Sequence, residues 1–518
     1  MRTIAAVCAL VIGIYGGVAV QAPSAAARDL QSWHDYNNDS IPDLAIGIPG
    51  ETVNGQAGAG AVEVLYGGPN NVGLRSTGSQ FFNEGLLTTT DGPSAGDAFG
   101  SALASGDFDA DGYSDLAIGI PGEDIVFPSS TGMEYGAIVV LWGSATGLVE
   151  DTSVSTFKGG RTSAGVGKAL VALDIIHANN TEPTVVDNIA DLAIAEGDGR
   201  VIVEPGGSRQ FLSVAGRRLL NVQMTDPTRQ LVLAQGNIDG DFPAELLLGM
   251  PGARKQVGNT VVDGAGAFLI INRIAGNSFG GLSAQLFFQE DVGFASEAGD
   301  NFGASFATGQ LTGSGLFNEE LVVGAPGQDV TFEGISRDQA GMAFLFMSGV
   351  TATGMTTITE KSAGVPDNPE PGDRFAQRIA IGHFRDDNVD DIAYGVPGEM
   401  IGNVDGAGAV IIEYRNFSNV YQLISQNTTG VPGAIGANDK FGNALAAGNF
   451  NRDEVTDLAI GVPLDNEPSG VNNSGTVNVI YSDGTSFAPR PGDVLWSQAT
   501  AGVSGSPGPA DKFGFALR

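Results

Sequence analysis

Short apolar runs bounded by glycine and proline recur along the chain and predict β-strands throughout. In the block Asp115–Gly122, large and small residues alternate before a Pro-Gly turn. Six other segments follow the same pattern, at intervals of roughly 54 to 76 residues, which is typical of an array of supersecondary units. The seven copies begin at Asp43, Asp115, Asp191, Glu245, Glu320, Asp391 and Asp457.

Two further runs accompany each copy. A β-branched and aliphatic block such as Gly60–Tyr66 or Gly136–Trp142 follows it, and a short run such as Ser101–Ala104 or Asn443–Ala446 precedes it. With a variable outer strand, each unit has about four strands, which is the content of a propeller blade. The pattern indicates no helix of ten or more residues. It therefore predicts an all-β fold, a seven-bladed β-propeller.

The two ends of the repeat array complement each other. The chain ends on Asp511–Leu517, which resembles the opening of another unit, whereas few residues precede Asp35 in the first unit. Pairing of residues 511–518 with the first blade would explain both ends, while a chain cut short at Arg518 would explain only the tail. A linear solenoid is the alternative architecture.

We expect one propeller domain over residues 28–518 rather than separate domains. Its blade units are centred near residues 43–66, 115–142, 191–206, 245–271, 320–346, 391–414 and 457–481.

The first residues have the features of a signal peptide over 1–27. Arg2 supplies a positive charge, Ile4–Val20 is apolar, and Ala25–Ala27 provides small residues for cleavage. The only cysteine, Cys8, lies inside this segment, so the mature chain is expected to have no thiol or disulfide. No later apolar run reaches the length of a membrane span. We expect a secreted, extracellular protein, or a periplasmic one in a Gram-negative host.

Charge and composition narrow the choice of partners. The chain has 59 acidic side chains against 25 Lys plus Arg, a formal net charge of −34. Binding to nucleic acid or to an anionic membrane requires clustered basic residues, so both are disfavoured. The hydrophobic fraction of 42% is ample for a core, so the acidity does not indicate disorder.

An acidic loop, Asp107–Asp115, lies between the short opening run and the Asp-Leu-Ala-Ile block. Hard cations take six to eight oxygen ligands, and alternate residues of a tight loop can point toward one ion. The loop is not an EF-hand, because its twelfth position is Ile118 and strands flank it. The spacing predicts a Ca²⁺ site formed by Asp107, Asp109, Asp111, the Tyr113 carbonyl and Asp115, with Gly112 at the turn.

Three other loops repeat this spacing, with differences. The loop that begins at Asp35 has Ser40 in place of the glycine. The loop that begins at Asn237 has Phe242 there, followed by Pro243. Alternatively, the Asp and Asn residues form Asx-turns that bind no metal, and this alternative is strongest for the Asn237 loop. The candidate ligands are Asp35, Asn37, Asp39, Ile41 and Asp43; then Asn449, Asn451, Asp453, Val455 and Asp457; and finally Asn237, Asp239, Asp241 and Glu245.

Three units lack the acidic spacing. The loop near Gln310 offers only Thr312 and Ser314, and the loop after Asp174 is expanded and irregular. The loop after His383 places Arg385, a cation, at a ligand position.

The openings and turns of the units resemble FG-GAP repeats, as found in integrin α subunits and bacterial integrin-like proteins. The residues concerned are Phe99-Gly100, Phe302-Gly303, Phe441-Gly442 and Phe513-Gly514, with turns such as Gly324–Pro326. Phe375-Ala376 and Val166-Gly167 are weakened versions, and Arg229-Gln230 departs from the pattern. The resemblance covers essentially the whole mature chain. It implies a seven-bladed propeller, cell adhesion or protein recognition, and calcium in the acidic loops, on the face opposite the usual ligand-binding face.

The sequence contains no catalytic motif of a familiar kind. His34, His177 and His383 are far apart along the chain, and no Gly-x-Ser-x-Gly elbow, phosphate loop or HExxH motif is present. Asp151–Ser155 spells the DxSxS of a metal-dependent adhesion site, but no buried strand leads into it and no helix follows. Integrin-like propellers also accompany a glycosylphosphatidylinositol-cleaving phospholipase, whose metal-bearing catalytic domain has no counterpart here. We therefore expect a binding protein rather than an enzyme.

Two functional classes remain at this point. The first is a calcium-binding module that recognises an extracellular protein or a cell-surface ligand. The second is a secreted carbohydrate-active propeller, either a lectin or a hydrolase or lyase. Trp142 and Trp496 are aromatic residues of the kind that stack on sugars, although the position of both favours packing in a strand or in the core. The sequons at Asn416 and Asn427 would matter only in a glycosylating host.

Overall fold

The computed structural model describes residues 34–518 except for several loop segments. The exceptions are residues 70–71, 89–91, 125–135, 151–155, 159–164, 176–188, 197–198, 208, 210–217, 222–229, 241–243, 273–282, 314–317, 348, 352, 416–419, 467–469 and 488–491. The predicted signal peptide, the Asp151–Ser155 stretch and the sequon at Asn416 therefore lie outside the described residues. Within the described part of the chain, no helix has the length and apolar character needed to cross a bilayer.

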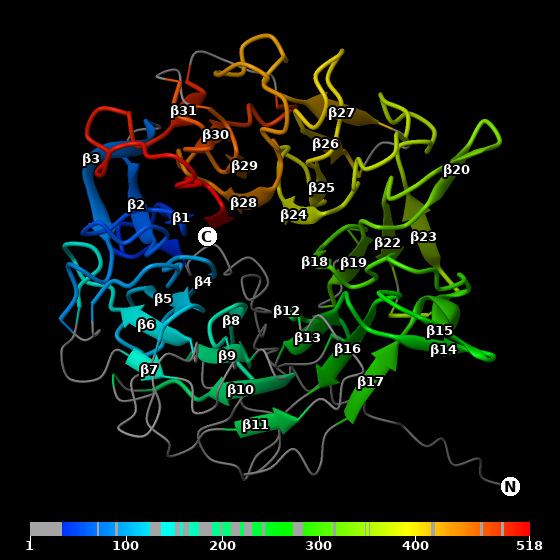
Figure 1. The fold of residues 1–518 in the computed structure, drawn as a ribbon, viewed down its shortest axis with the longest axis horizontal. Helices are drawn as coiled ribbons and strands as arrows, with labels where there is room; N and C mark the ends of the chain where they lie inside the picture. Colours follow the sequence, from blue (N-terminus) through cyan, green and yellow to red (C-terminus); the bar gives the residue numbers. More distant parts are fainter. Residues whose placement is uncertain are drawn as a thin grey trace, which may run out of the picture.

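Seven four-stranded antiparallel sheets form a ring around a central axis (Figure 1). The described residues contain no α-helix, only a short 3₁₀ helix, η2 (Gln289–Val292). The expectation of an all-β, seven-bladed β-propeller is confirmed. We number the sheets as blades 1 to 7 in chain order.

The strands of the blades have the following bounds. Blade 1 holds β1 (Leu44–Ile48), β2 (Ala61–Gly68), β3 (Gly73–Phe82) and β32 (Ala516–Leu517). Blade 2 holds β4 (Leu103–Gly106), β5 (Asp115–Ile120), β6 (Ala137–Leu141) and β7 (Thr156–Lys158). Blade 3 holds β8 (Leu170–Leu173), β9 (Asp191–Glu196), β10 (Arg200–Glu204) and β11 (Arg218–Asn221). Blade 4 holds β12 (Val232–Gly236), β13 (Glu245–Met250), β16 (Ala267–Asn272) and β17 (Ser283–Phe287).

In blades 2 to 7 the strands are given from the axis outward, whereas in blade 1 the innermost strand is β32. Blade 5 holds β18 (Ser305–Gly309), β19 (Glu320–Ala325), β22 (Met342–Phe346) and β23 (Met355–Ile358). Blade 6 holds β24 (Arg378–Gly382), β25 (Asp391–Val396), β26 (Ala409–Glu413) and β27 (Tyr421–Ile424). Blade 7 holds β28 (Ala444–Gly448), β29 (Asp457–Val462), β30 (Thr476–Ile480) and β31 (Val494–Trp496).

The hydrophobic core lies between neighbouring blades. One cluster joins Val62 and Val64 of blade 1 to Leu116 and Ile118 of blade 2, and Phe99 fills the space between the two sheets. Because both faces of each second strand are covered, all six residues of β5 are buried, including the small ones. This packing explains why the second strands read as continuous apolar runs.

Close contact between blades requires glycine at one position of the second strand. A Cβ atom on Gly119 would lie 2.0 Å from the carbonyl oxygen of Gly167 in blade 3. Phe99, just before blade 2, forms a parallel bridge with Gly60 at the start of the third strand of blade 1. The Phe-Gly opening of one unit is therefore part of its contact with the preceding unit.

The C-terminal strand belongs to the first blade. β32 pairs with β1, with Ile46 opposite Leu517 and Gly47 opposite Ala516. Ala45 and Arg518 exchange two backbone hydrogen bonds, of 2.7 and 3.0 Å. Figure 1 shows the C-terminus beside β1, near the centre of the ring. This pairing supplies the inner strand of blade 1.

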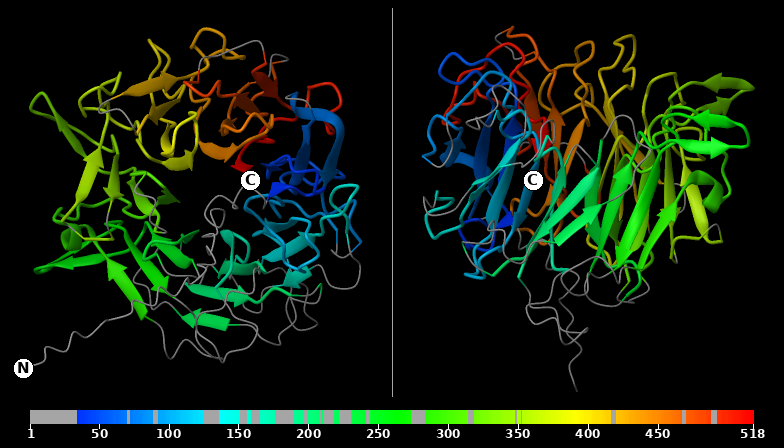
Figure 2. Two further views of the ribbon diagram at one scale, coloured as in Figure 1. Left: turned by 180° about the vertical axis from the view of Figure 1, so that it is seen from behind. Right: turned by 60° about the horizontal axis from the view of Figure 1, so that its bottom comes forward.

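Two hairpins that the sequence did not indicate extend blades 4 and 5. β14 (Lys255–Val257) pairs with β15 (Thr260–Val262), and β20 (Val330–Phe332) pairs with β21 (Ile335–Arg337). Each hairpin follows the second strand of its blade, and both project at the edge of the ring (Figures 1 and 2).

Candidate metal-binding loops

The four predicted acidic loops lie on one face of the ring. Three of them connect the innermost strand of a blade to the second strand, and the Asp35 loop leads into β1, the second strand of blade 1, so each lies at the same end of the sheets. We call this the loop face. The two hairpins follow the opposite ends of second strands, and we call that side the hairpin face.

The Asp107 loop brings three carboxylates together. Asp107, Asp109 and Asp115 each offer an oxygen within 4.8 Å of the others. Backbone amides hold the loop in shape, since Asp107 accepts hydrogen bonds from the Asp111 and Gly112 nitrogens at 3.1 and 3.0 Å. Gly112 has a φ of 89°, a conformation that favours glycine. The arrangement fits the carboxylate donor set that a hard cation prefers.

Burial raises the pKa of Asp107 and raises the pKa of Asp115 well above its usual range, and in both cases neighbouring carboxylates add to the effect. Both observations mean that the ionised forms are held at an electrostatic cost in the absence of a cation. A divalent ion among these oxygens would offset that cost.

An arginine from the next blade also contacts this loop. Arg209 Nε lies 2.6 Å from Asp109 Oδ2, and its Nη2 lies 3.1 Å from Asp111 Oδ2. The guanidinium group also stacks 5.5 Å from the centre of the Trp142 ring. Arg209 therefore shares two of the predicted calcium ligands, and nothing in the local sequence of the loop indicates it.

The Asp35 loop has the same backbone hydrogen bonds but a wider spread of carboxylates. Asp35 accepts hydrogen bonds from the Asp39 and Ser40 nitrogens at 3.0 and 2.7 Å, and Asp39 accepts one from Ile41 at 3.0 Å. Ser40 adopts the left-handed conformation of Gly112, with a φ of 67°. Among the described residues, Asp35, Asp39 and Asp43 do not form a group as close as that of the Asp107 loop.

The Asn449 loop repeats this geometry with less charge. The Asp453 nitrogen donates to Asn449 Oδ1 and to Asn451 Oδ1, each at 3.0 Å, and the Val455 nitrogen donates to Asp453 Oδ1 at 3.3 Å. The Asn451 side-chain amide also donates to Asp453 Oδ2 at 2.8 Å. One of the predicted ligand oxygens is thus engaged within the loop.

The Asn237 loop is only partly described, because Asp241 lies outside the described residues. Asp239 accepts a hydrogen bond from the Asn272 side chain at 3.0 Å, and Glu245 accepts one from the Ile238 nitrogen at 2.7 Å.

The carboxylate at the ninth position also has a structural role. In blade 2, Asp115 accepts hydrogen bonds from the Phe108 and Gly143 nitrogens, both at 2.8 Å. Asp191 in blade 3 accepts the equivalent pair although its unit lacks the acidic spacing. The acid therefore fastens the loop and the following hairpin to the second strand in blades with and without a predicted cation site.

In blade 6 a guanidinium group occupies the loop. Arg385 donates to Asp391 through Nε and Nη2 at 3.0 and 2.7 Å, and Nη2 lies 3.2 Å from Asp387. Its side chain is only 6% exposed. Arg385 supplies a fixed positive charge among the acids of this loop.

A pocket of about 390 Å³ opens at the centre of the ring on the loop face. It is lined by residues of several blades, including His34, Glu319, His383, Asp390 and Asn449. His383 Nδ1 lies 3.9 Å from Asp390 Oδ1. The ring thus brings together two histidines that are far apart in the sequence. Trp142 and Trp496, the aromatic residues considered for sugar stacking, are both buried.

The chain forms a seven-bladed β-propeller with a cluster of carboxylates in the Asp107 loop on one face. A model of the FG-GAP repeat matches residues 35–65, 99–141 and 441–480, which include the acidic loops of blades 1, 2 and 7. Three units of this seven-bladed β-propeller therefore match the FG-GAP repeat.

Proteins of two kinds are similar to this chain in sequence. Mouse phosphatidylinositol-glycan-specific phospholipase D is 26% identical over 402 residues, covering 70% of this chain and 42% of the relative. Mouse integrin alpha-8 is 26% identical over 281 residues, covering 50% of this chain and 23% of the relative. The chain thus spans less than half the length of either. The solved structure of Sqt1 from Chaetomium thermophilum aligns with 79% of this chain and 73% of its own, at 14% identity and a TM-score of 0.40.

Proposed function

We propose that this protein is an exported, calcium-stabilised β-propeller that recognises a protein ligand outside the cell. The observation that carries the proposal is the similarity to integrin alpha-8 over half of the chain, in a ring that keeps the acidic loops. We assign to the ring the recognition of an extracellular partner and no catalytic activity.

The calcium part of the proposal rests on the Asp107 loop, where three carboxylates already converge. A bound ion would link Asp107 and Asp109 to Asp115 of β5, which fixes the loop to its blade. Because the ligands are brought together by folding, the ion would stabilise the native state by RT ln(1 + [L]/Kd), about 2.7 kcal/mol at a hundredfold excess over Kd.

The recognition part rests on the hairpin face. Val261 of β15 and Ile335 of β21 are 54% and 57% exposed, in hairpins on neighbouring blades. Exposed apolar side chains that project from a rigid ring are typical of a protein contact.

Recognition is tested by binding of extracellular proteins from the native source to immobilised mature protein, followed by identification and titration of the bound partner. The double variant Val261→Glu/Ile335→Glu should lose the partner. The control Val420→Glu changes a valine that is 42% exposed in the turn between β26 and β27, on the loop face, and should retain it. Reproducible polysaccharide or phospholipid turnover, abolished by one carboxylate substitution, would show that the protein is an enzyme instead.

Calcium binding is tested by titration calorimetry and by melting with and without chelator. The wild type should melt at a lower temperature in chelator and recover with Ca²⁺ more fully than with Mg²⁺, which demands stricter octahedral geometry. The variant Asp109→Asn/Asp111→Asn should lose one ion and part of the shift. If the folded wild type binds no calcium, these loops are Asx-turns only.

A further inference from the structure

Five junctions between blades contain a repeated set of three buried polar residues on the hairpin face. The first residue lies two positions after an outer strand, the second two positions before the Phe of the next unit, and the third three positions after the second strand of the later blade. All fifteen are buried. In chain order of the second residue, the sets are Glu84, Asp97 and Glu123; Gln289, Asp300 and Gln328; Glu360, Asp373 and Glu399; Gln426, Asp439 and Asp465; and Gln498, Asp511 and Glu51.

Glutamine in the first position supplies a hydrogen-bond donor. Gln426 Nε2 donates to Asp465 Oδ2 at 3.0 Å, and Gln498 Nε2 donates to Glu51 Oε2 at 2.5 Å. The side-chain amide of Gln289 contacts that of Gln328, also at 2.5 Å. At these three junctions, a neutral donor from one blade bridges to the next blade.

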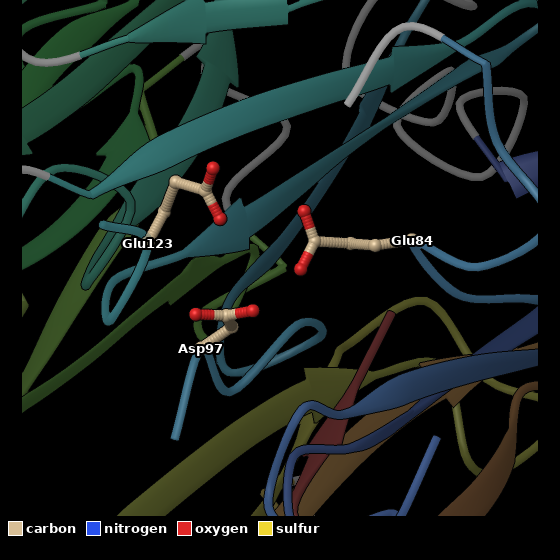
Figure 3. Close-up of side chains that lie close together, drawn as sticks. All are labelled: Glu84, Asp97 and Glu123. Carbon is tan, nitrogen blue, oxygen red and sulfur yellow. The ribbon is translucent and has the colours of Figure 1, made fainter. Parts of the chain in front are cut away.

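Glutamate takes the first position at the other two junctions. Figure 3 shows Glu84, Asp97 and Glu123 with their carboxylates turned toward one another. At the junction of blades 5 and 6, Glu360, Asp373 and Glu399 each offer an oxygen within 4.8 Å of the others. A carboxylate cannot replace the amide as a donor.

At the junction of blades 5 and 6, two buried carboxylates have no hydrogen-bond donor among the described residues. Glu360 is 2% exposed and Glu399 is fully buried, and none of their four carboxylate oxygens has a hydrogen-bond partner among the described residues. Asp373 accepts a hydrogen bond from the backbone nitrogen of Glu370. Asp367 and Glu370 form a second, overlapping group with Glu399. Buried carboxylate oxygens of this kind require a hydrogen-bond donor, a proton or a cation as partner.

We propose that Glu360, Asp373 and Glu399 bind a hard divalent cation, for which Ca²⁺ is the best match, between blades 5 and 6. Ca²⁺ lies about 2.3 to 2.6 Å from its oxygen ligands, so two ligands of one ion are separated by at most about 5 Å. The separations in this cluster agree with that limit. Carboxylates alone, in an irregular arrangement, suit Ca²⁺ better than transition metals.

The electrostatics of the cluster favour an added cation. Burial and the facing acids raise the pKa of Glu360 well above its usual range, and burial raises that of Glu399 to about 9. Arg337 of β21 acts on Glu370, where its positive charge lowers the pKa. Protons shared between the carboxylates are the rival way of neutralising this charge.

This site differs from the acidic loops in position and in consequence. It lies on the hairpin face, and it joins Glu360 of blade 5 to Asp373 and Glu399 of blade 6. Lys361, beside Glu360, donates to the carbonyl of Thr331 in β20 at 3.3 Å. A bound ion would therefore cross-link two blades at the base of a hairpin.

The chain itself offers the test variant, Glu360→Gln, because glutamine occupies this position at three other junctions. Wild type and variants are dialysed to equilibrium against Ca²⁺, and the bound metal is measured by elemental analysis. Glu360→Gln should bind one ion fewer than the wild type, and Asp109→Asn/Asp111→Asn should lose a different one, so the combined variant loses two. Glu399→Gln, which copies Gln328, should match Glu360→Gln. Glu333→Gln, an exposed charge change in the β20–β21 turn, should lose none.

Melting in chelator gives the second readout. Metal-free Glu360→Gln should melt above metal-free wild type, because one buried acid is gone, and its calcium-induced shift should be smaller. If Glu360→Gln and Glu399→Gln both fold and bind as many ions as the wild type, the cluster is neutralised by protons and the proposal is wrong. That result would not contradict calcium binding at the acidic loops, because the Asp109→Asn/Asp111→Asn variant tests those sites separately.

Discussion

At the level of single residues, the position of Arg209 determines how much negative charge the Asp107 loop presents to a cation. Its side chain is 38% exposed, and its guanidinium group is bound to Asp109 and Asp111. An incoming ion must either displace this group or bind beside a positive charge. Both routes weaken calcium binding.

We predict that Arg209→Gln binds Ca²⁺ about fivefold more tightly at this loop, the equivalent of losing a partly exposed ion pair worth about 1 kcal/mol. Calorimetric titration measures the change. Arg254→Gln is the matched control. Arg254 forms an exposed ion pair with Asp263, with 2.6 Å between Nε and Oδ1, and this pair does not involve the Asp107 loop. Unchanged affinity in Arg209→Gln would mean that the ion does not use Asp109 and Asp111.

Glu63 of β2 is a second residue with a measurable consequence. It is fully buried between Ile46 and Phe81 in the sheet, and burial raises its pKa to about 7. The folded state therefore keeps a proton that the unfolded chain releases near its ordinary pKa of 4.5. Stability is greatest below that value and falls as the pH rises through 7.

We expect Glu63→Gln to abolish this contribution. Urea unfolding in chelator at pH 5.5 and pH 8 should show a smaller fall in the free energy of unfolding than in wild type, by at most about 3 kcal/mol. Glu333→Gln should keep the wild-type fall. Equal pH dependence in wild type and Glu63→Gln would contradict the assignment.

At the level of elements, the loop of blade 6 shows how a fixed side-chain charge takes part in an acidic turn. Arg385 is bound to Asp391 within the same hairpin, so the loop needs no ion to balance that carboxylate. Removing one member of a buried pair leaves the other charge uncompensated.

We predict that Arg385→Gln lowers the free energy of unfolding by about 3 kcal/mol, with no rescue by calcium. Urea unfolding with and without Ca²⁺ measures both parts. Arg452→Gln, an exposed arginine in the matching loop of blade 7, should change stability by less than about 0.5 kcal/mol. Rescue of Arg385→Gln by calcium would contradict the role of Arg385 as a fixed charge.

The elements that the sequence predicted are those whose residues are buried on both faces. The second and third strands of each blade, such as β5 and β6, are covered by neighbouring sheets and so repeat the same apolar pattern. The hairpins β14–β15 and β20–β21 were not predicted. Their residues are mostly exposed, as in Thr260–Val262, and few packing contacts constrain their identity.

The candidate site divides in the same way. Ligands within one loop were found from spacing, because the loop is a local structure. The sets of three at the junctions were not found, although Asp-x-Phe recurs before the units, because Glu360 and Glu399 meet only when two blades pack. Arg209 contacts Asp109 from 100 positions away along the chain, which no local pattern indicates.

At the level of the whole molecule, the ring depends on the short pairing of β32 with β1. Two paired positions and the two hydrogen bonds between Ala45 and Arg518 supply the inner edge of blade 1. Without them, β1 would present an open edge toward the axis.

We predict that truncation after Phe515 lowers the melting temperature by at least about 1 °C, since the lost pairing and exposed edge are worth more than about 1 kcal/mol and a domain of this size loses about 1 °C for each kcal/mol. Scanning calorimetry in saturating calcium measures the shift. An unchanged melting temperature would show that the ring is held closed by side-chain packing alone.

The contact between Phe99 and Gly60 also bears on how such a chain grows. At four junctions a Phe at the start of one unit bridges to a Gly at the third strand of the preceding blade, and Val166 takes the place of the Phe at a fifth. At these junctions the start of one unit contacts the third strand of the unit before it, so the units join in a head-to-tail order. A tandem duplication of one unit in the gene would add a blade whose two interfaces are already complementary to its neighbours. Curvature, and not the chemistry of the junctions, would then limit the number of blades.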